Sequence, residues 1–210
     1  MDHIEQLIRY HLTPEMIAFD VGANHGGYAL IMASVCQQVI GFEPIPELAE
    51  DLRRRAPANL SVETLALSDR EGRADFHIDL REGLNAQQSS LLTVDELHQA
   101  KLVRTVTVET ITLDHYVATR GVTPDFLKID VEGWEPEVFA GAARTLAEHR
   151  PVVLFEMWET HYPRYRDWFH RLDATHHLVR AGAPLAAIPY YEAATRYEVA
   201  DVLAIPRLRR

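Results

Sequence analysis

A glycine-rich turn that begins with a carboxylate is the first segment of this sequence with the residues for chemistry. It runs Asp20-Val21-Gly22-Ala23-Asn24-His25-Gly26-Gly27, after the apolar segment Met16–Phe19 and before an apolar run with helical spacing. Glycines let a backbone turn tightly and approach a ligand closely, and the N-terminus of a helix presents unpaired N–H groups. We interpret Asp20 as suited to a cationic or amine-bearing ligand. A purely structural turn needs the same residues, so the segment alone indicates a ligand weakly.

Glu43 strengthens this interpretation. It ends the next apolar segment, Val39–Glu43, at the place where an acid in a nucleotide-binding α/β fold accepts hydrogen bonds from ribose hydroxyls. A glutamate at a strand end that only faces solvent is the alternative. The combination with the glycine-rich turn favours a contact with ribose.

Further charged residues follow two later apolar segments. Lys128 and Asp130 are two residues apart and share one side of an extended strand, and ligands of open α/β sheets bind beyond the carboxyl ends of the strands. We predict Asp130 as a general base or acceptor-orienting carboxylate with Lys128 in support; a structural ion pair is the alternative. Glu132 either joins this catalytic group or caps the helix that starts near Trp134. Glu156 either contacts the substrate or cofactor or is a buried structural acid.

The same acids raise the question of a metal ion. Asp130, Glu132, Glu156 and His161 supply the oxygen-rich ligands that Mg²⁺ accepts, if they converge. No fixed spacing demands such a site, and the sequence therefore predicts no metal.

The segments that must position these residues alternate between strand and helix. Predicted strands are Met16–Asp20, Val39–Glu43, Leu60–Leu65, Arg73–Asp79, Thr105–Thr110, Asp125–Val131, Val152–Met157, His176–Arg180 and Asp201–Ile205. Predicted helices are Asp2–Leu12, Gly27–Gln37, Pro46–Arg55, Glu135–Glu148 and Arg164–Leu172. The near-continuous apolar strands indicate an α/β fold with a doubly wound, mostly parallel central sheet and helices on both faces. We expect one domain over 1–210, with an N-terminal helix in 1–14, a core with the ligand motifs in 15–157, and completion of the sheet by 158–210.

The polar segment Glu82–Lys101 is unusually long for a connection in a compact domain. Asn85, Ser89 and Ser90 give it a hydrogen-bonding surface suited to a polyhydroxylated substrate, and we predict them as substrate-binding residues. A plain solvated linker is the alternative. The segment Gly182–Tyr197 has no clear period and receives no assignment.

Composition argues against several classes of partner. The chain has 210 residues, 47% hydrophobic and 25% charged, which is ordinary for a soluble globular protein. Its net charge of −10 repels phosphate backbones and disfavours nucleic acid. No apolar run is long enough to cross a bilayer, no secretory signal is visible, and Cys36 is alone. We therefore expect a cytoplasmic protein without a membrane partner, a disulfide framework or a cysteine-based metal site.

An ordered set of short motifs over about residues 16–157 resembles the FkbM-type methyltransferase family. The motifs are Asp20-Val21-Gly22-Ala23-Asn24, Phe42-Glu43-Pro44, Ala66-Leu67-Ser68-Asp69, Ser89-Ser90-Leu91, Thr112-Leu113-Asp114, Leu127–Gly133, Gly141-Ala142 and Pro151–Glu156. The resemblance implies a class I methyltransferase (Rossmann-like) fold that binds S-adenosyl-L-methionine. It places Asp20, Gly22, Asn24, Gly26 and Tyr28 around the methionine part of the cofactor, Glu43 at the ribose with Pro44 beside it, and Ser68 and Asp69 near the adenine.

The function implied is methylation of a hydroxyl on a sugar, a polyketide or a related small molecule. Two alternatives stay open. A nicotinamide-dependent oxidoreductase shares the glycine-rich turn and the ribose acid, but the turn here lacks the G-x-G-x-x-G pattern. A non-catalytic binding or scaffold module that keeps the fold is the other, because fold does not guarantee activity.

Overall fold

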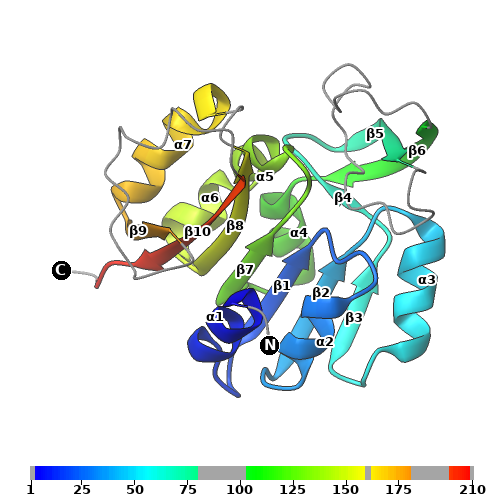
Figure 1. Ribbon diagram of the computed structural model, residues 1–210, viewed down its shortest axis with the longest axis horizontal. Helices are drawn as coiled ribbons and strands as arrows, with labels where there is room; N and C mark the ends of the chain where they lie inside the picture. The colour runs from blue at the N-terminus through cyan, green and yellow to red at the C-terminus, as the bar shows by residue number, and fades with distance from the viewer. Residues whose placement is uncertain (1–2, 80–102, 159–161, 181–198, 209–210) are drawn as a thin grey trace.

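The computed structural model describes residues 3–79, 103–158, 162–180 and 199–208, and helices and strands alternate along most of them (Figure 1). The elements are α1 (His3–His11), β1 (Ile17–Val21), α2 (Gly27–Ala33), β2 (Gln38–Phe42), α3 (Pro46–Arg55), β3 (Leu60–Glu63), β4 (Ala66–Leu67), β5 (Gly72–Asp79), β6 (Val103–Ile111), α4 (Leu113–Arg120), β7 (Phe126–Ile129), α5 (Glu135–Gly141), α6 (Ala143–Glu148), β8 (Val152–Trp158), α7 (Tyr162–Asp173), β9 (His176–Arg180) and β10 (Val199–Pro206). The segments Glu82–Lys101 and Gly182–Tyr197 lie outside the described residues, as do Asn85, Ser89, Ser90 and His161.

Seven strands form the central sheet in the order β3-β2-β1-β7-β8-β10-β9. The strands from β3 to β8 are parallel, and β10 runs antiparallel to both β8 and β9. The chain builds outward from β1 to β3 and then returns to place β7 on the other side of β1, so the order reverses between β1 and β7. This arrangement confirms the predicted doubly wound, mostly parallel α/β fold, whose ligand crevice forms at such a reversal.

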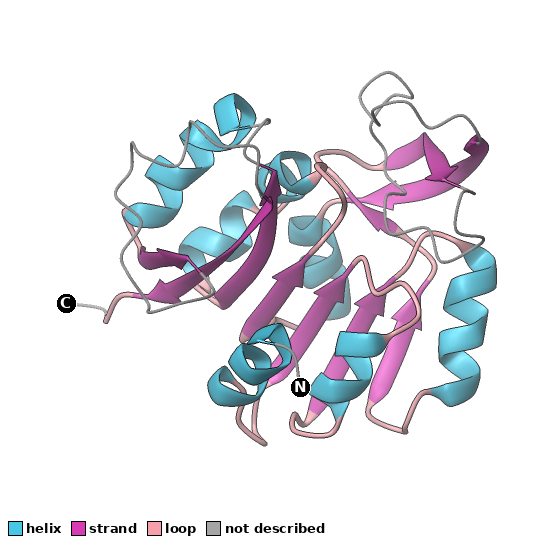
Figure 2. Ribbon diagram, viewed as in Figure 1, coloured by secondary structure: helices cyan, strands magenta, loops and turns pink. Residues whose placement is uncertain are grey.

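Helices cover both faces of the central sheet (Figure 2), and the buried side chains of its strands alternate between two apolar layers. Ala18, Phe126 and Leu154 pack in one layer with α1, α2 and α3, whereas Phe19 and Leu127 pack in the other with α4, α5, α6 and α7. Because side chains alternate along a strand, the even-numbered Asp20, Lys128, Asp130 and Glu156 fall on the α2 side. Glu43 follows Val39 and Gly41 onto that side as well. The charged residues at the carboxyl ends of β1, β2, β7 and β8 thus lie on one face of the sheet.

A second, three-stranded sheet in the order β4-β6-β5 lies beside the carboxyl ends of the first. The antiparallel pair β5–β6 matches the predicted strands Arg73–Asp79 and Thr105–Thr110 within two residues, and Phe76, Ile78 and Val108 pack beneath it against Ile45 and Leu48. The predicted strand Leu60–Leu65 corresponds to β3 within two residues. That strand ends at Glu63, and the chain enters the second sheet as β4.

The predicted helix Glu135–Glu148 is two helices that meet at Ala142. Asp114 of α4 contacts the start of the second helix: its carboxylate accepts hydrogen bonds from the backbone N–H groups of Arg144 (2.9 Å) and Thr145 (2.8 Å) and from the Thr145 hydroxyl (2.7 Å). The first turn of α6 is therefore capped by a side chain from another helix. Helix α4 itself was missed, although Thr112 caps its N-terminus by accepting from the His115 N–H (3.1 Å) and Gly121 follows its end.

Capping by Asp114 generates a stability prediction. Asp114→Ala removes three acceptor contacts at the start of α6, and we expect the free energy of unfolding to fall by about 1–2 kcal/mol. Urea denaturation at neutral pH measures this change. Asp167→Ala is the matched control, since its side chain is 78% exposed and its ion pair among the described residues is with the neighbouring Arg166; it should change the free energy by less than about 0.5 kcal/mol. Equal losses in the two variants would contradict the capping role.

Candidate active site

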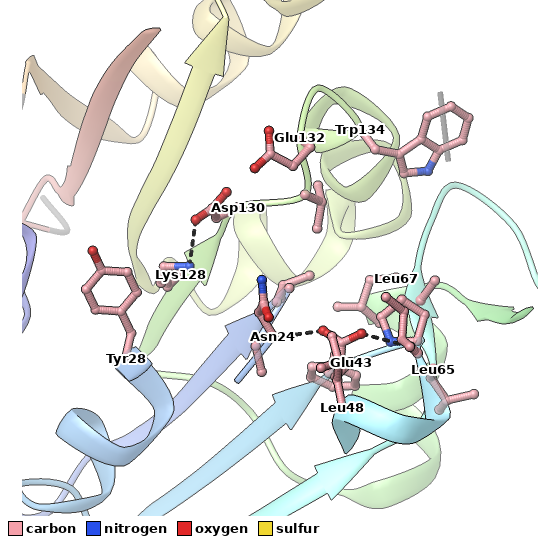
Figure 3. A pocket seen from close by; sticks show the side chains of 18 of the residues that line it. Asn24, Tyr28, Glu43, Leu48, Leu65, Leu67, Lys128, Asp130, Glu132 and Trp134 are labelled. Carbon is pink, nitrogen blue, oxygen red and sulfur yellow. Dashed lines mark hydrogen bonds and ion pairs between the residues drawn. The ribbon is translucent and has the colours of Figure 1, made fainter. Parts of the chain in front are cut away.

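A cavity of about 480 Å³ opens at the carboxyl ends of β1, β2, β7 and β8, beside the point where the strand order reverses (Figure 3). One end is apolar and is bordered by Leu48, Leu65, Leu67, Phe76 and Trp134. The other end carries Tyr28, Lys128, Asp130, Glu132 and Glu156. The cavity therefore changes from an apolar wall at one end to a cluster of charged side chains at the other, with the turn after β1 between them.

The turn after β1 follows the bottom of the cavity because Gly22 permits it. Gly22 has φ of 81°, and a Cβ there would lie 1.9 Å from the backbone oxygen of Asp130. The N–H groups of Gly22 and Ala23 both donate to the Phe42 carbonyl at 3.0 Å. Gly22 thus allows the end of β1 to touch the end of β7, which is a packing requirement as well as a way to bring backbone close to a ligand.

Glu43 and Asn24 form the polar middle of the cavity (Figure 3). Glu43 is 4% exposed, and its two carboxylate oxygens accept from the backbone N–H groups of Asn24 (2.8 Å) and Ile45 (2.8 Å). Burial raises the pKa of Glu43 to about 7 although these two hydrogen bonds lower it. A carboxylate oxygen has more than one acceptor position, so both oxygens can still accept from a ligand. The Asn24 Oδ1 atom is buried without a hydrogen-bond partner among the residues that the structure describes, which marks a place for a donor.

Lys128 joins two strands at the base of the charged end. Its ammonium lies 3.5 Å from Asp20 Oδ1 and 3.1 Å from Asp130 Oδ2, and 4.9 Å from the centre of the Tyr28 ring. Burial by itself would lower the pKa of Lys128, but the two carboxylates outweigh it and hold the pKa above its ordinary value. Lys128 therefore stays charged. The Lys128–Asp130 ion pair exists and it also borders the cavity, so the structural and the catalytic interpretations of the pair are both compatible with this geometry.

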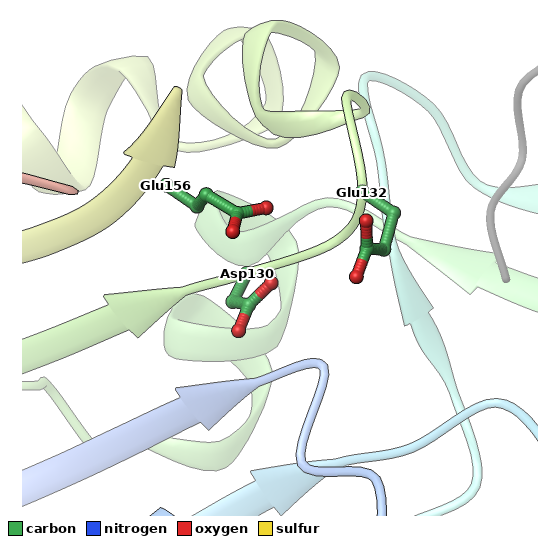
Figure 4. A group of neighbouring side chains, drawn as sticks. All are labelled: Asp130, Glu132 and Glu156. Carbon is green, nitrogen blue, oxygen red and sulfur yellow. The ribbon is translucent and has the colours of Figure 1, made fainter. Parts of the chain in front are cut away.

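Three carboxylates converge beyond Lys128 (Figure 4). One oxygen each from Asp130, Glu132 and Glu156 lies within 4.8 Å of the others. The parallel register pairs Ile129 with Phe155, so Asp130 and Glu156 follow at the same level of neighbouring strands. Burial, and then the charges of Asp130 and Glu156, raise the pKa of Glu132 to about 10. Glu132 therefore favours its protonated form at neutral pH.

The convergence of these three carboxylates raises the question of a bound metal ion. The cluster is the group of described residues able to share a divalent cation, since carboxylate oxygens are its preferred ligands. The absence of a metal stays a prediction from the sequence.

Several predicted site residues lie outside the cavity. Asp20, Gly26, Ser68 and Asp69 are not among its described lining residues. Asp20 is 1% exposed beneath the cavity, where it pairs with Lys128. Ser68 is buried and accepts from the Trp134 indole N–H (3.2 Å), while its own hydroxyl donates to Asp69 (3.1 Å). Among the predicted residues, those that line the cavity are Gly22, Asn24, Tyr28, Glu43, Pro44, Lys128, Asp130, Glu132 and Glu156.

Other lining residues were missed. Leu65, Leu67 and Phe76 reach the cavity because the second sheet folds over it, and an apolar residue in a strand pattern gives no sign of this.

Glu132 does not cap the next helix; its φ is 55°, and Glu135 accepts from the Val131 and Gly133 N–H groups instead. Asp201 of β10 lines a smaller adjoining cavity of about 150 Å³ with Lys128, Asp130 and Glu156.

The comparison with known protein families decides the relationship. The sequence model of the family described as methyltransferase FkbM domain matches residues 20–183. The chain belongs to this family. Two curated relatives agree with that membership. The 2-O-methyltransferase NoeI of Sinorhizobium fredii is 30% identical over 158 residues, covering 69% of this chain and 65% of the relative. The hexuronic acid methyltransferase AglP of Haloferax volcanii is 30% identical over 142 residues, covering 66% of this chain and 54% of the relative.

Solved structures of methyltransferases share the fold of this FkbM-family chain. The methyltransferase FkbM of Methylobacillus flagellatus KT aligns with a TM-score of 0.58 at 15% identity, over 92% of this chain and 44% of that protein. The protein SMU.1697c of Streptococcus mutans, solved in complex with SAH, aligns with a TM-score of 0.55 at 11% identity over 99% of both chains. The fold is that of class I methyltransferases. The chain spans between half and two thirds of the length of the curated relatives it matches. None of the described helices has the length and apolar character that a membrane crossing requires.

The buried Glu43 predicts a pH dependence of stability. Its pKa in the folded protein, about 7, lies above the ordinary value of 4.5, so the folded state binds more protons than the unfolded state between these values. The contribution of Glu43 to stability is therefore favourable at low pH and is lost as pH rises through 7. Between pH 5 and pH 8 the loss amounts to roughly 2.5 kcal/mol.

Urea denaturation of wild type and Glu43→Gln at pH 5 and pH 8 measures it. The variant places an amide against a backbone N–H and is destabilised at both pH values, but its deficit should shrink by that amount at pH 8. A deficit that does not change with pH would show that Glu43 titrates normally.

Proposed function

We propose that this protein is an S-adenosyl-L-methionine-dependent O-methyltransferase that acts on a hydroxyl of a sugar or a similar polyhydroxylated small molecule. The observation that carries the proposal is the grading of one cavity, from the apolar wall through the Asn24–Glu43 pair to the carboxylates of Asp130, Glu132 and Glu156. Family membership supports the reaction, and the names of NoeI and AglP support a sugar acceptor.

The residues of the cavity fit the cofactor part by part. The apolar wall of Leu48, Leu65 and Leu67 suits the faces of an adenine ring. The carboxylate of Glu43 accepts from the ribose hydroxyls, and the unpartnered Asn24 Oδ1 accepts from a further donor of the cofactor. Tyr28 and Gly27, at the start of α2, border the methionine part. When bound, the cofactor supplies an electrophilic methyl group on a sulfonium.

We assign the positioning and deprotonation of the acceptor hydroxyl to the carboxylate cluster. Transfer to a hydroxyl needs an acceptor oxygen held in line with the methyl–sulfur bond, and loss of the hydroxyl proton. Asp130 is anchored by Lys128, so its free oxygen has a defined direction. Glu132 holds a proton at neutral pH because burial, and then the charges of Asp130 and Glu156, raise its pKa; this leaves Asp130 or Glu156 to accept the proton of the acceptor. Glu156 and the adjoining 150 Å³ cavity border the side from which an acceptor approaches.

Ligand binding tests the cofactor. S-adenosylhomocysteine or S-adenosylmethionine at about 100 times its dissociation constant should add ~2.7 kcal/mol to the free energy of unfolding, and raise the melting temperature by roughly 5–10 °C. Differential scanning fluorimetry with each ligand, and with NAD as the matched control, measures the shift. A shift with NAD alone would replace the methyltransferase by an oxidoreductase. No shift with any ligand would favour a scaffold without a cofactor.

Turnover tests the role of Asp130. With labelled S-adenosylmethionine and a panel of monosaccharides and methyl glycosides, we expect methyl transfer to at least one hydroxyl. Asp130→Asn should lower kcat about 10²–10⁴-fold, with the dissociation constant of S-adenosylhomocysteine near that of wild type. Asp51→Asn, on the exposed ion pairs of α3, should keep wild-type kcat. Undiminished kcat in Asp130→Asn would remove Asp130 from proton transfer, and a failure to fold would assign the Lys128–Asp130 pair to stability.

A further inference from the structure

The loop between β7 and α5 has a backbone conformation that is unfavourable for one of its residues, Glu132. Glu132 has φ of 55° and Gly133 has φ of 89°, and the left-handed region is unfavourable for a residue with a side chain. The same turn brings the Glu132 carboxylate within 4.8 Å of Asp130 and Glu156, where like charges repel. A different loop conformation would relieve both the strain and the repulsion. Contacts from outside the turn must therefore hold it.

One buried carboxylate supplies the first of these contacts. Glu135 is fully buried, and its Oε1 atom accepts from the N–H of Val131 (2.9 Å) and the N–H of Gly133 (3.3 Å), on either side of Glu132. Its Oε2 atom accepts from the hydroxyl of Tyr165, which is also fully buried. Burial raises the pKa of Glu135 to about 7, against the effect of these hydrogen bonds. Both oxygens of the Glu135 carboxyl thus accept hydrogen bonds, one from the backbone of the turn and the other from α7.

Helix α7 holds the turn at a second point. Arg164, next to Tyr165, donates from Nη1 to the carbonyl oxygen of Gly133 (3.0 Å) and from Nη2 to Glu137 (2.6 Å). Two consecutive residues of α7 therefore fix the turn from both sides, one at a carbonyl and the other through Glu135 at two amides. This is more restraint than capping a seven-residue helix requires.

We propose that Glu135 and Tyr165 are positioning residues of the methyl-transfer site, which hold the turn so that Glu132 faces Asp130 and Glu156. The proposal rests on the proposed function, because the cluster matters to catalysis only if it receives the acceptor proton. Neither residue lines the described cavity; both act through the backbone of residues 131–133. Through this backbone, the pair sets the distance of the Glu132 carboxyl from Asp130 and Glu156.

Tyr165→Phe tests the proposal by removing one hydroxyl while leaving the ring and the charge of Glu135. Tyr116→Phe is the matched control. Tyr116 is 3% exposed, and its hydroxyl donates to Glu63 (2.9 Å) in another part of the fold. Each variant loses one tyrosine–glutamate hydrogen bond, so the urea midpoints of both should fall. A role in stability alone predicts no other difference between them.

The decisive measurement is the titration of Glu132, followed by carboxyl ¹³C NMR. Burial raises the pKa of this carboxyl, the charges of Asp130, Glu156 and Glu135 that face it raise it further, and Lys128 lowers it. In Tyr165→Phe the turn relaxes and the carboxylates separate, so the midpoint of Glu132 should fall by about one pH unit or more. It should stay at the wild-type value in Tyr116→Phe. With an accepted sugar, kcat of Tyr165→Phe should also fall by about tenfold or more, with unchanged affinity for S-adenosylhomocysteine.

An unchanged Glu132 midpoint in Tyr165→Phe would overturn the positioning role, whatever the loss of stability. If that variant does not fold, Arg164→Met serves in its place: it keeps an apolar stem and removes the contact to Gly133, and the same fall in the Glu132 midpoint is expected. A wild-type protein that binds no adenosyl ligand would overturn the proposed function, yet the titration would still report on the turn. The two failures are therefore distinguishable.

Discussion

The arrangement of the site depends on one buried ammonium. Lys128 stands opposite Asp20 in the parallel register of β7 and β1, and reaches on to Asp130. A lone charge at this depth would be prohibitively costly, so its burial requires both carboxylates at their present positions. The trio therefore ties the two strands at the reversal of the sheet and gives Asp130 a fixed direction. It also accounts for the burial of Asp20, at the end of β1, beneath the cavity.

The cavity inherits its polarity from the alternation of the strands. Every second side chain of the central strands packs against α1, α2 and α3. The same alternation, continued to the carboxyl ends of the strands, places Asp20, Asp130 and Glu156 on that side. The apolar end comes from another source, since Leu67 belongs to the second sheet and Leu65 precedes it. A ligand with an aromatic ring at one end and a cation at the other matches this gradient. The order agrees with the cofactor proposed for this FkbM-family protein.

Restraint around the carboxylate cluster is supplied from a distance. Like charges within a few ångströms separate unless the backbone that carries them is held. Here the turn that carries Glu132 is tied to α5 by Glu135 and to α7 by Arg164 and Tyr165. The C-terminal part of the chain thus contributes to the site through hydrogen bonds to backbone. Strain of this kind persists where the surroundings over-determine a conformation, and it is concentrated at functional sites.

The sequence by itself determined the elements whose signals are local. Helix α3 has the predicted bounds Pro46–Arg55, strands β1, β2, β7 and β8 lie within two residues of their predictions, and the strand-end positions of Glu43 and Asp130 follow from apolar segments that stop there. Tertiary structure decided what those side chains meet. Four features each join segments far apart in the chain. They are the ion pair of Asp20 with Lys128, the cap on α6 by Asp114, the pairing of β4 in the second sheet, and the hydrogen bond from Tyr165 to Glu135. Hydrophobic period and capping residues act over a few positions, whereas a buried charge takes whichever partner the packed layers bring within reach.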